Sequence, residues 1–388
     1  MAEAGRAWRA ALDAAADDRE RCVARIGLAG VKRVTDDLAG ALSDLEQAEA
    51  VAVPQHLVAE PAHIHFLRGN LCFPRGDLDG CLREHGLALE LARSGGAAEL
   101  EGMALGGLGD AEYVRGRMIS EHDRFSECVG LCERHGFGQI EVANRPMMAF
   151  TRFFAGDIRG ALAVADIAIA RAALVGQRRA EMIGHHAAFF CWHALIEFDA
   201  AARHAEAALS LAQQLGARRF ETEALAFRAE LHRRAGRRAK ALADAEAAVR
   251  ISRETGMGFL GPFALGALAL ASNDPAARRT ALEEAEALLG AGAVSHNHLL
   301  FPRDAVEAYL EAENWDGIER TAAELEEYTR REPLPFAAFY IARARALAAS
   351  GRNRPDPAAL DRLRDEAERL RILVALPAIE SALNELRA

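Results

Sequence analysis

The sequence has no run of apolar residues long enough to cross a membrane. A membrane-spanning helix needs about 18 or more consecutive apolar residues, and the 388-residue chain contains no such run. Its N-terminus also lacks the apolar core of a secretory signal peptide. We therefore expect a cytoplasmic protein that does not associate with membranes.

Positive charge is also scarce. The chain has 47 Lys and Arg residues against 57 Asp and Glu, which gives a net charge of −10. Its only lysines are Lys32 and Lys240. Binding of nucleic acid or of an anionic membrane requires clustered positive charge. The composition therefore disfavours nucleic acid as a partner.

Motifs for catalysis, metals and cofactors are missing. The sequence has no Gly-x4-Gly-Lys-Ser/Thr phosphate loop and no recognisable Ser/His/Asp nucleophile motif. His185 and His193 are eight residues apart, whereas a zinc-binding pair on a helix has a spacing of four. The six cysteines are typical of buried reduced thiols, and a metal site at Cys128 and Cys132 is the less favoured alternative. We predict no enzyme activity, no catalytic residue, no metal and no cofactor.

Glycine, in contrast, recurs with a fixed period. Five glycines are spaced 40 residues apart, and a second series runs midway between them with Ile196 in its one gap. A fixed period of this length is the signature of a repeat solenoid. The first series is Gly96, Gly136, Gly176, Gly216 and Gly256, and the second is Gly76, Gly116, Gly156 and Gly236.

The segments between these glycines predict helices. They are about 16 residues long and rich in Ala, Leu, Glu and Arg, which are strong helix formers. Glycine accepts a positive φ without a Cβ clash and is therefore favoured just after a helix. Each 40-residue unit then reads as two antiparallel helices. Small residues also recur every 40 positions, as at Cys81, Ala161, Ala201 and Ala241, and would let neighbouring helices approach closely.

One stretch resembles the tetratricopeptide repeat. It is Gly69-Asn70-x5-Gly76-Asp77-Leu78-x2-Cys81-x6-Ala88, with a small residue early in the first helix, Gly-Asp at the turn and two small residues seven apart in the second helix. The resemblance implies an all-α, right-handed superhelical solenoid of antiparallel helix pairs. The 40-residue period exceeds the 34 residues usual for the family, so we expect longer helices.

Four other stretches resemble the C-terminal repeat region of bacterial signalling proteins. In those proteins such repeats are joined to a class III nucleotide cyclase or a regulator ATPase. The chain has no phosphate loop, so their activities are not transferred to any residue here. The stretches are His65–Leu71, Gly107–Asp110, Ser252–Phe259 and Val294–His298.

We expect one solenoid along the whole chain, because no long Gly-, Ser- or Pro-rich linker divides it. Residues 1–20 are predicted to form an N-terminal helix without a partner, and residues 21–294 seven helix hairpins. Residues 295–388 are predicted to form irregular hairpins and a cap, with helices near 336–349, 358–373 and 377–387.

The family resemblance also selects candidate binding residues, because the first helix of each hairpin lines the concave face in tetratricopeptide stacks. Aromatic residues make up only 6% of the chain, yet several fall at these positions. Exposed apolar patches of this kind usually mark binding sites; the alternative is that some rings only fill the core. The predicted groove comprises His63, Phe66, Asn70, Phe73, Met103, Asp110, Tyr113, Phe150, Phe153, His186, Phe190, His193, Glu230 and Arg233.

Two functions remain open from the sequence. The first is a non-catalytic module that binds a peptide or helix of a partner protein in the concave groove. The second is a small-molecule-sensing regulatory domain of a signalling protein, in which ligand binding controls an output domain.

Overall fold

The chain is almost entirely helical. A computed structural model describes residues 2–35, 37–55, 57 and 59–386, of which 85% are helical and none is in a strand. The helices are α1 (Ala2–Ala14), α2 (Asp18–Val34), α3 (Leu38–Ala52), α4 (Ala59–Cys72), η1 (Phe73–Arg75), α5 (Leu78–Ser94), α6 (Ala98–Val114), α7 (Met118–His135), α8 (Gly138–Phe154), α9 (Ile158–Val175), α10 (Arg178–Ala194), α11 (Phe198–Leu215), α12 (Arg218–Arg234), α13 (Arg238–Thr255), α14 (Met257–Ala271), α15 (Pro275–Gly290), α16 (Ser295–Glu311), α17 (Trp315–Thr329), α18 (Pro335–Gly351), α19 (Pro357–Leu370), η2 (Leu373–Ala375) and α20 (Leu376–Glu385).

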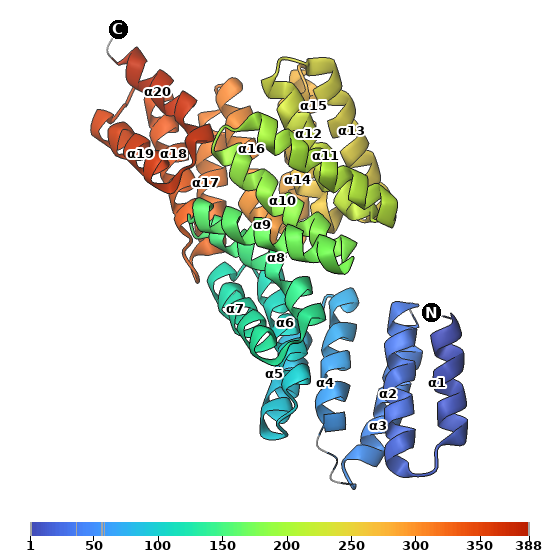
Figure 1. Cartoon of the computed structure of the whole chain (residues 1–388). Helices are drawn as coiled ribbons and strands as arrows, with labels where there is room; N and C mark the ends of the chain where they lie inside the picture. Colours follow the sequence, from blue (N-terminus) through green and yellow to red (C-terminus); the bar gives the residue numbers. More distant parts are fainter. Residues whose placement is uncertain (1, 36, 56, 58, 387–388) are drawn as a thin grey trace. The chain divides into compact units, whose positions relative to one another are not determined.

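Helix packing divides the chain into two units, which we describe separately (Figure 1). The first unit contains Met1–Arg115 and Ser120–Asn144, and the second contains Gly116–Ile119 and Arg145–Ala388. Within each unit, consecutive helices pack as antiparallel hairpins.

The first helices of successive hairpins also contact each other. In the first unit α2 meets α4 and α4 meets α6, and in the second unit α12 meets α14 and α14 meets α16. Among the described residues, the second helices α11, α13 and α15 make no comparably extensive contacts with one another. The stack within each unit therefore curves with its first helices on the inner side, and we call these α2, α4, α6, α8, α10, α12, α14, α16 and α18 the inner helices.

The glycine positions have the predicted conformation. Gly76 ends η1 at φ 69°, and the adjacent Asp77 accepts a hydrogen bond from the Gly80 amide at 2.8 Å, which caps α5. Gly176 ends α9 in the left-handed conformation at φ 72°. Gly256 is an exception in detail, because its φ of 107° and ψ of 115° lie outside the left-handed helical region although it still separates α13 from α14.

Small residues bring the paired helices together. Cys81, Ala161, Ala201 and Ala241 have no exposed surface. The Cys81 thiol lies 3.5 Å from the Gly69 carbonyl oxygen of the neighbouring helix. A longer side chain at these sites would push the hairpin apart, so the periodic small residues are a packing requirement.

The prediction of an unpartnered N-terminal helix is wrong. Helix α1 ends at Ala14 and packs on α2, where the Trp8 ring lies over Gly27. Helix α2 begins at Asp18 with a capping box, in which Asp17 accepts from the Glu20 amide and Glu20 accepts from the amide of residue 16. The tryptophan supplies an apolar face that the 40-residue ladder does not register.

The C-terminal helices agree more closely with the sequence. The structure has α18, α19 and α20 where three helices were expected. These helices return to the beginning of the second unit. Phe336 of α18 contacts Phe153 and Phe154 of α8, with ring centroids 5.3 and 5.4 Å apart, and Leu370 of α19 lies against Gly156.

Ile196 occupies a turn position at which the other hairpins have glycine. Its φ is 59°, a conformation that is strained for a β-branched residue, and its side chain is 47% exposed. We expect Ile196→Gly to raise the free energy of unfolding by about 0.5–1 kcal/mol, because relief of strain outweighs the added freedom of the unfolded chain. Urea melts of both proteins measure this, and an unchanged or lower midpoint would show that the turn is not strained.

Candidate functional site

The predicted groove residues of the first unit retain accessible surface. His63, Phe66 and Asn70 of α4 are half-buried, Tyr113 of α6 is half-buried and Asp110 of α6 is exposed. The His63 and Phe66 rings are 6.3 Å apart. Residues from two adjacent inner helices thus form one partly exposed face, which also includes the half-buried Phe73 and Met103. We call His63, Phe66, Asn70, Phe73, Met103, Asp110 and Tyr113 the inner face of the first unit.

A buried histidine supports this face from behind. His85 of α5 has no exposed surface, and its ring lies 5.6 Å from Phe66 and 6.2 Å from Phe73. A Cβ added at Gly69 or Gly107 would lie 2.6 or 2.4 Å from the His85 ring. Glycine at both positions therefore makes room for the imidazole, which fixes the distance between α4 and α6.

Burial keeps His85 neutral. Desolvation lowers its pKa to about 4, although the nearby Glu84 charge acts in the opposite direction. Sequence reasoning did not single out this residue. The only available signal was the pair of glycines inside helices, which often indicates that something bulky packs against them.

The corresponding aromatic residues of the second unit are buried. Phe150 is 9% exposed, Phe153 4% and Phe190 2%. The Phe190 ring lies 6.0 Å from Phe150, 5.6 Å from Phe153 and 5.0 Å from Phe227. The expectation that Phe150 and Phe190 are partly exposed is therefore wrong. The physical reason is that α18 packs back onto α8, so that rings expected to face an open groove meet other rings.

The predicted histidines of this unit are buried too. His186 lies with its Nδ1 2.6 Å from the Glu223 carboxylate, and His193 with its Nε2 3.5 Å from that of Glu230. Desolvation lowers the pKa of His193 to about 4, against the opposing influence of Glu230. Helix α10 therefore presents neither histidine to solvent, and each contacts a carboxylate of α12.

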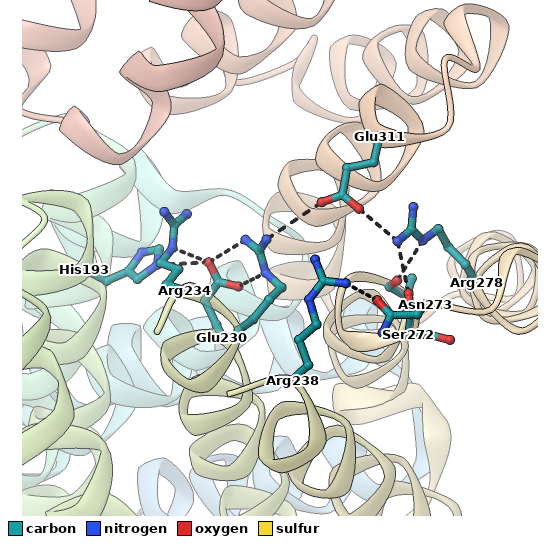
Figure 2. A network of polar contacts seen from close by, with 10 residues as sticks. His193, Glu230, Arg234, Arg238, Ser272, Asn273, Arg278 and Glu311 are labelled. Atoms are coloured by element: carbon teal, nitrogen blue, oxygen red, sulfur yellow. Dashed lines mark hydrogen bonds and ion pairs between the residues drawn. The ribbon is translucent and has the colours of Figure 1, made fainter. Parts of the chain in front are cut away.

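Glu230 is the centre of the polar network in Figure 2. Its carboxylate accepts hydrogen bonds from Arg233 Nε at 2.8 Å and from Arg234 Nε at 2.5 Å. Burial alone would raise the Glu230 pKa, but the His193 contact and the Arg234 and Arg233 charges outweigh it, and the pKa lies well below its usual value. Glu230 is thus ionised and a poor proton acceptor at neutral pH.

The network continues to neighbouring helices. Arg233 Nη1 is 3.8 Å from Glu311 of α16, and Arg278 of α15 is 2.9 Å from the same carboxylate. Arg278 also donates to the Ser272 carbonyl oxygen at 3.0 Å. These contacts join the C-terminal ends of α12, α14 and α16 (Figure 2). The arrangement is that of a structural clamp, because arginine neutralises each carboxylate.

A small cavity lies between these charges and the aromatic core. Its walls include Phe227, Glu230, Phe263, Arg303 and Asp304, and it has room for about one water molecule. Ligand pockets are far larger, about 300–1,000 Å³. The cavity is therefore a packing defect in a polar core and too small for a metabolite.

The six cysteines are buried free thiols. The described residues contain no group of three or more His, Cys, Asp or Glu side chains arranged to hold a metal ion. A search of the same residues finds no helix with the length and apolar character needed to span a membrane.

Comparison with known proteins identifies the fold. No family model and no curated protein sequence matches the chain. A solved Rap protein complexed with Competence and Sporulation Factor superposes with a TM-score of 0.61 at 13% identity, covering 82% of this chain and 88% of that one. The fold is a tetratricopeptide-like helical solenoid.

Two further solved structures align less well. The apo form of RapI gives a TM-score of 0.47 over 75% of this chain and 98% of that chain. The tetratricopeptide domain of P58(IPK) gives 0.26 over 95% of this chain and 99% of that chain. Both are 13% identical to this sequence.

Proposed function

We propose that this chain is a non-catalytic interaction module that binds a segment of a partner protein on the inner face of the first unit. The observation that carries the proposal is the contrast between the two units. The equivalent inner-helix positions are partly exposed in α4 and α6, whereas Phe150, Phe153 and Phe190 are buried. Only the first set retains apolar surface that a partner can cover.

The chemistry of this face suits an extended or helical peptide. Phe66 and Phe73 are rigid rings that His85 supports from behind, so little conformational freedom is lost when a partner packs on them. Asn70 lies between them along α4 and provides both a hydrogen-bond donor and an acceptor for a peptide backbone. Aromatic anchors of this kind commonly supply 2 kcal/mol or more of binding energy.

The test uses peptides selected from a displayed library of random linear sequences. We expect wild-type protein to select ligands, and the double variant Phe66→Ala with Phe73→Ala to bind them at least about 30-fold more weakly, which corresponds to 2 kcal/mol. Isothermal titration calorimetry measures the affinities, and circular dichroism confirms that the variant is folded.

Leu87→Ala is the matched control. Leu87 is 37% exposed on α5, the second helix of the same hairpin, and lies outside the inner face. We expect this variant to bind the selected peptides like wild type. If the control weakens binding as much as the double variant does, or if the double variant keeps full affinity, the inner face is not the binding site.

The second hypothesis from the sequence, a small-molecule sensor, has one observation in its favour. An open surface depression of about 450 Å³ lies between α13 and α14, lined by Glu246, Val249, Arg250, Arg253, Glu254 and Leu268. This volume is in the range of small-molecule sites. A thermal-shift screen against metabolites separates the two hypotheses, because a ligand raises stability by about RT ln(1 + [L]/Kd).

The remaining sequence predictions are part of the same proposal. The module would work in the cytoplasm, without cofactor, and with a protein rather than nucleic acid as partner. The likeness to repeats of cyclase and regulator-ATPase proteins places it in signalling. Immunoblotting of fractionated cells tests the location.

A further inference from the structure

The most basic segment of this acidic chain is the turn between α12 and α13. Residues 232–240 read His-Arg-Arg-Ala-Gly-Arg-Arg-Ala-Lys, and no acidic residue occurs between Glu230 and Asp244. The chain as a whole carries a net charge of −10. A concentrated positive segment in such a chain is a local feature that composition does not explain.

The acidic groups around this turn are already paired. Glu230 binds Arg233 and Arg234, and Asp244 binds Arg228 through two hydrogen bonds of 2.8 Å. The remaining neighbour, Glu311, is shared by Arg233 and Arg278. The local carboxylates are thus occupied by arginines other than those that follow Gly236.

Three cations of the turn lack an acidic partner. Arg238 donates to the neutral amide oxygen of Asn273 at 2.7 Å, as Figure 2 shows. The exposed side chains of Arg237 and Lys240 make no hydrogen bond or ion pair with any residue that the structure describes. Their charge acts on the surroundings, since after burial the Arg237 charge is the largest influence that lowers the His232 pKa.

This turn also departs from the capping pattern of the other hairpins. Asp37, Asp77 and Asp157 each accept a hydrogen bond from the amide three residues later, at 2.8–2.9 Å. The equivalent residue of α13 is Arg237, which provides no side-chain cap. Cations in the first turn of a helix also oppose its dipole. The sequence therefore gives up local stability here in exchange for positive charge.

We propose that Arg237, Arg238 and Lys240 form a second interaction surface, which binds an acidic segment of a partner protein. The three cations lie within one helical turn, which matches a few neighbouring carboxylates. A nucleic acid needs a positive face that follows many phosphates, whereas this chain is acidic elsewhere. The surface lies in the second unit and does not depend on the function proposed for the first.

The test is binding of a fluorescent ten-residue peptide of alternating Glu and Asp, measured by anisotropy. We expect wild-type protein to bind it at low salt and to lose affinity as the salt concentration rises. Arg237→Glu combined with Lys240→Glu should weaken binding at least tenfold. Arg250→Glu, a charge reversal at an exposed position without a printed partner near the opposite end of α13, should change it less than twofold.

A further variant separates binding from folding. Arg237→Asp restores the cap found at Asp77 and Asp157, so it should raise the thermal midpoint while it weakens peptide binding. A damaged fold cannot produce that combination. The proposal is overturned if wild type does not bind the peptide, or if the double variant binds it like wild type. It is also overturned if single-stranded DNA or vesicles of anionic lipid bind more tightly than the peptide through these cations.

Discussion

Phe190→Ala is expected to lower the free energy of unfolding of the second unit by about 3–5 kcal/mol, the usual cost of truncating a buried phenylalanine. The Phe190 ring is 2% exposed and meets rings from four helices, including Phe150, Phe227 and Phe263. Its removal leaves a cavity that such interlocked rings cannot fill without leaving their own contacts. Urea melts of the wild-type protein and the variant measure the loss.

Leu174→Ala is the control for this prediction. Leu174 lies on α9 in the same unit and is 86% exposed, so its truncation should stay within about 0.5 kcal/mol of wild type. A small loss for Phe190→Ala, similar to that of the control, would mean that the ring is accessible and that α18 does not close over this face in solution.

The first unit is expected to lose about 2 kcal/mol of stability between pH 7 and pH 5 through His85 alone. Burial lowers the His85 pKa from 6.5 to about 4 in the folded state. The folded state therefore disfavours the proton that the unfolded chain accepts. The stabilising effect is complete above pH 6.5 and is lost progressively as the pH falls towards 4.

The measurement is hydrogen exchange of the α4–α6 amides at the two pH values, after correction for the intrinsic exchange rate. His85→Met, an apolar and flexible replacement without a titrating group, should remove about 2 kcal/mol of the pH dependence even if it changes stability at pH 7. His135→Gln, at an exposed position on α7, should leave the pH dependence unchanged. An unaltered pH dependence in His85→Met would show that His85 is not kept neutral by the fold.

Several features of the fold follow from residues that act locally. Gly76 and Gly176 mark turns because a positive φ penalises every residue that has a Cβ. Asp77 and Asp157 mark helix starts because a side-chain oxygen can accept from a free amide nearby. These interactions span three or four residues, so the sequence displays them directly. Ile196 could be placed only because the period around it was strict.

The candidate site was less predictable, because accessibility depends on segments far apart in the chain. Phe66 and Phe190 occupy equivalent positions in the repeat, yet one is half-exposed and the other buried. No local pattern distinguishes them. The difference arises where Phe336, more than a hundred residues later, packs against Phe153. His85 was missed for a similar reason, since its neighbours Gly69 and Gly107 belong to other helices.

The sequence alone determined the helical class, the 40-residue repeat, the hairpin turns and the small residues between paired helices, because each depends on backbone conformation or on contacts within one hairpin. Only the tertiary structure decided which inner-helix residues remain accessible and which carboxylates are neutralised by arginine. Those properties depend on the curvature that accumulates over successive hairpins and on the return of α18 to α8, and curvature is a sum of small packing angles that no single repeat encodes.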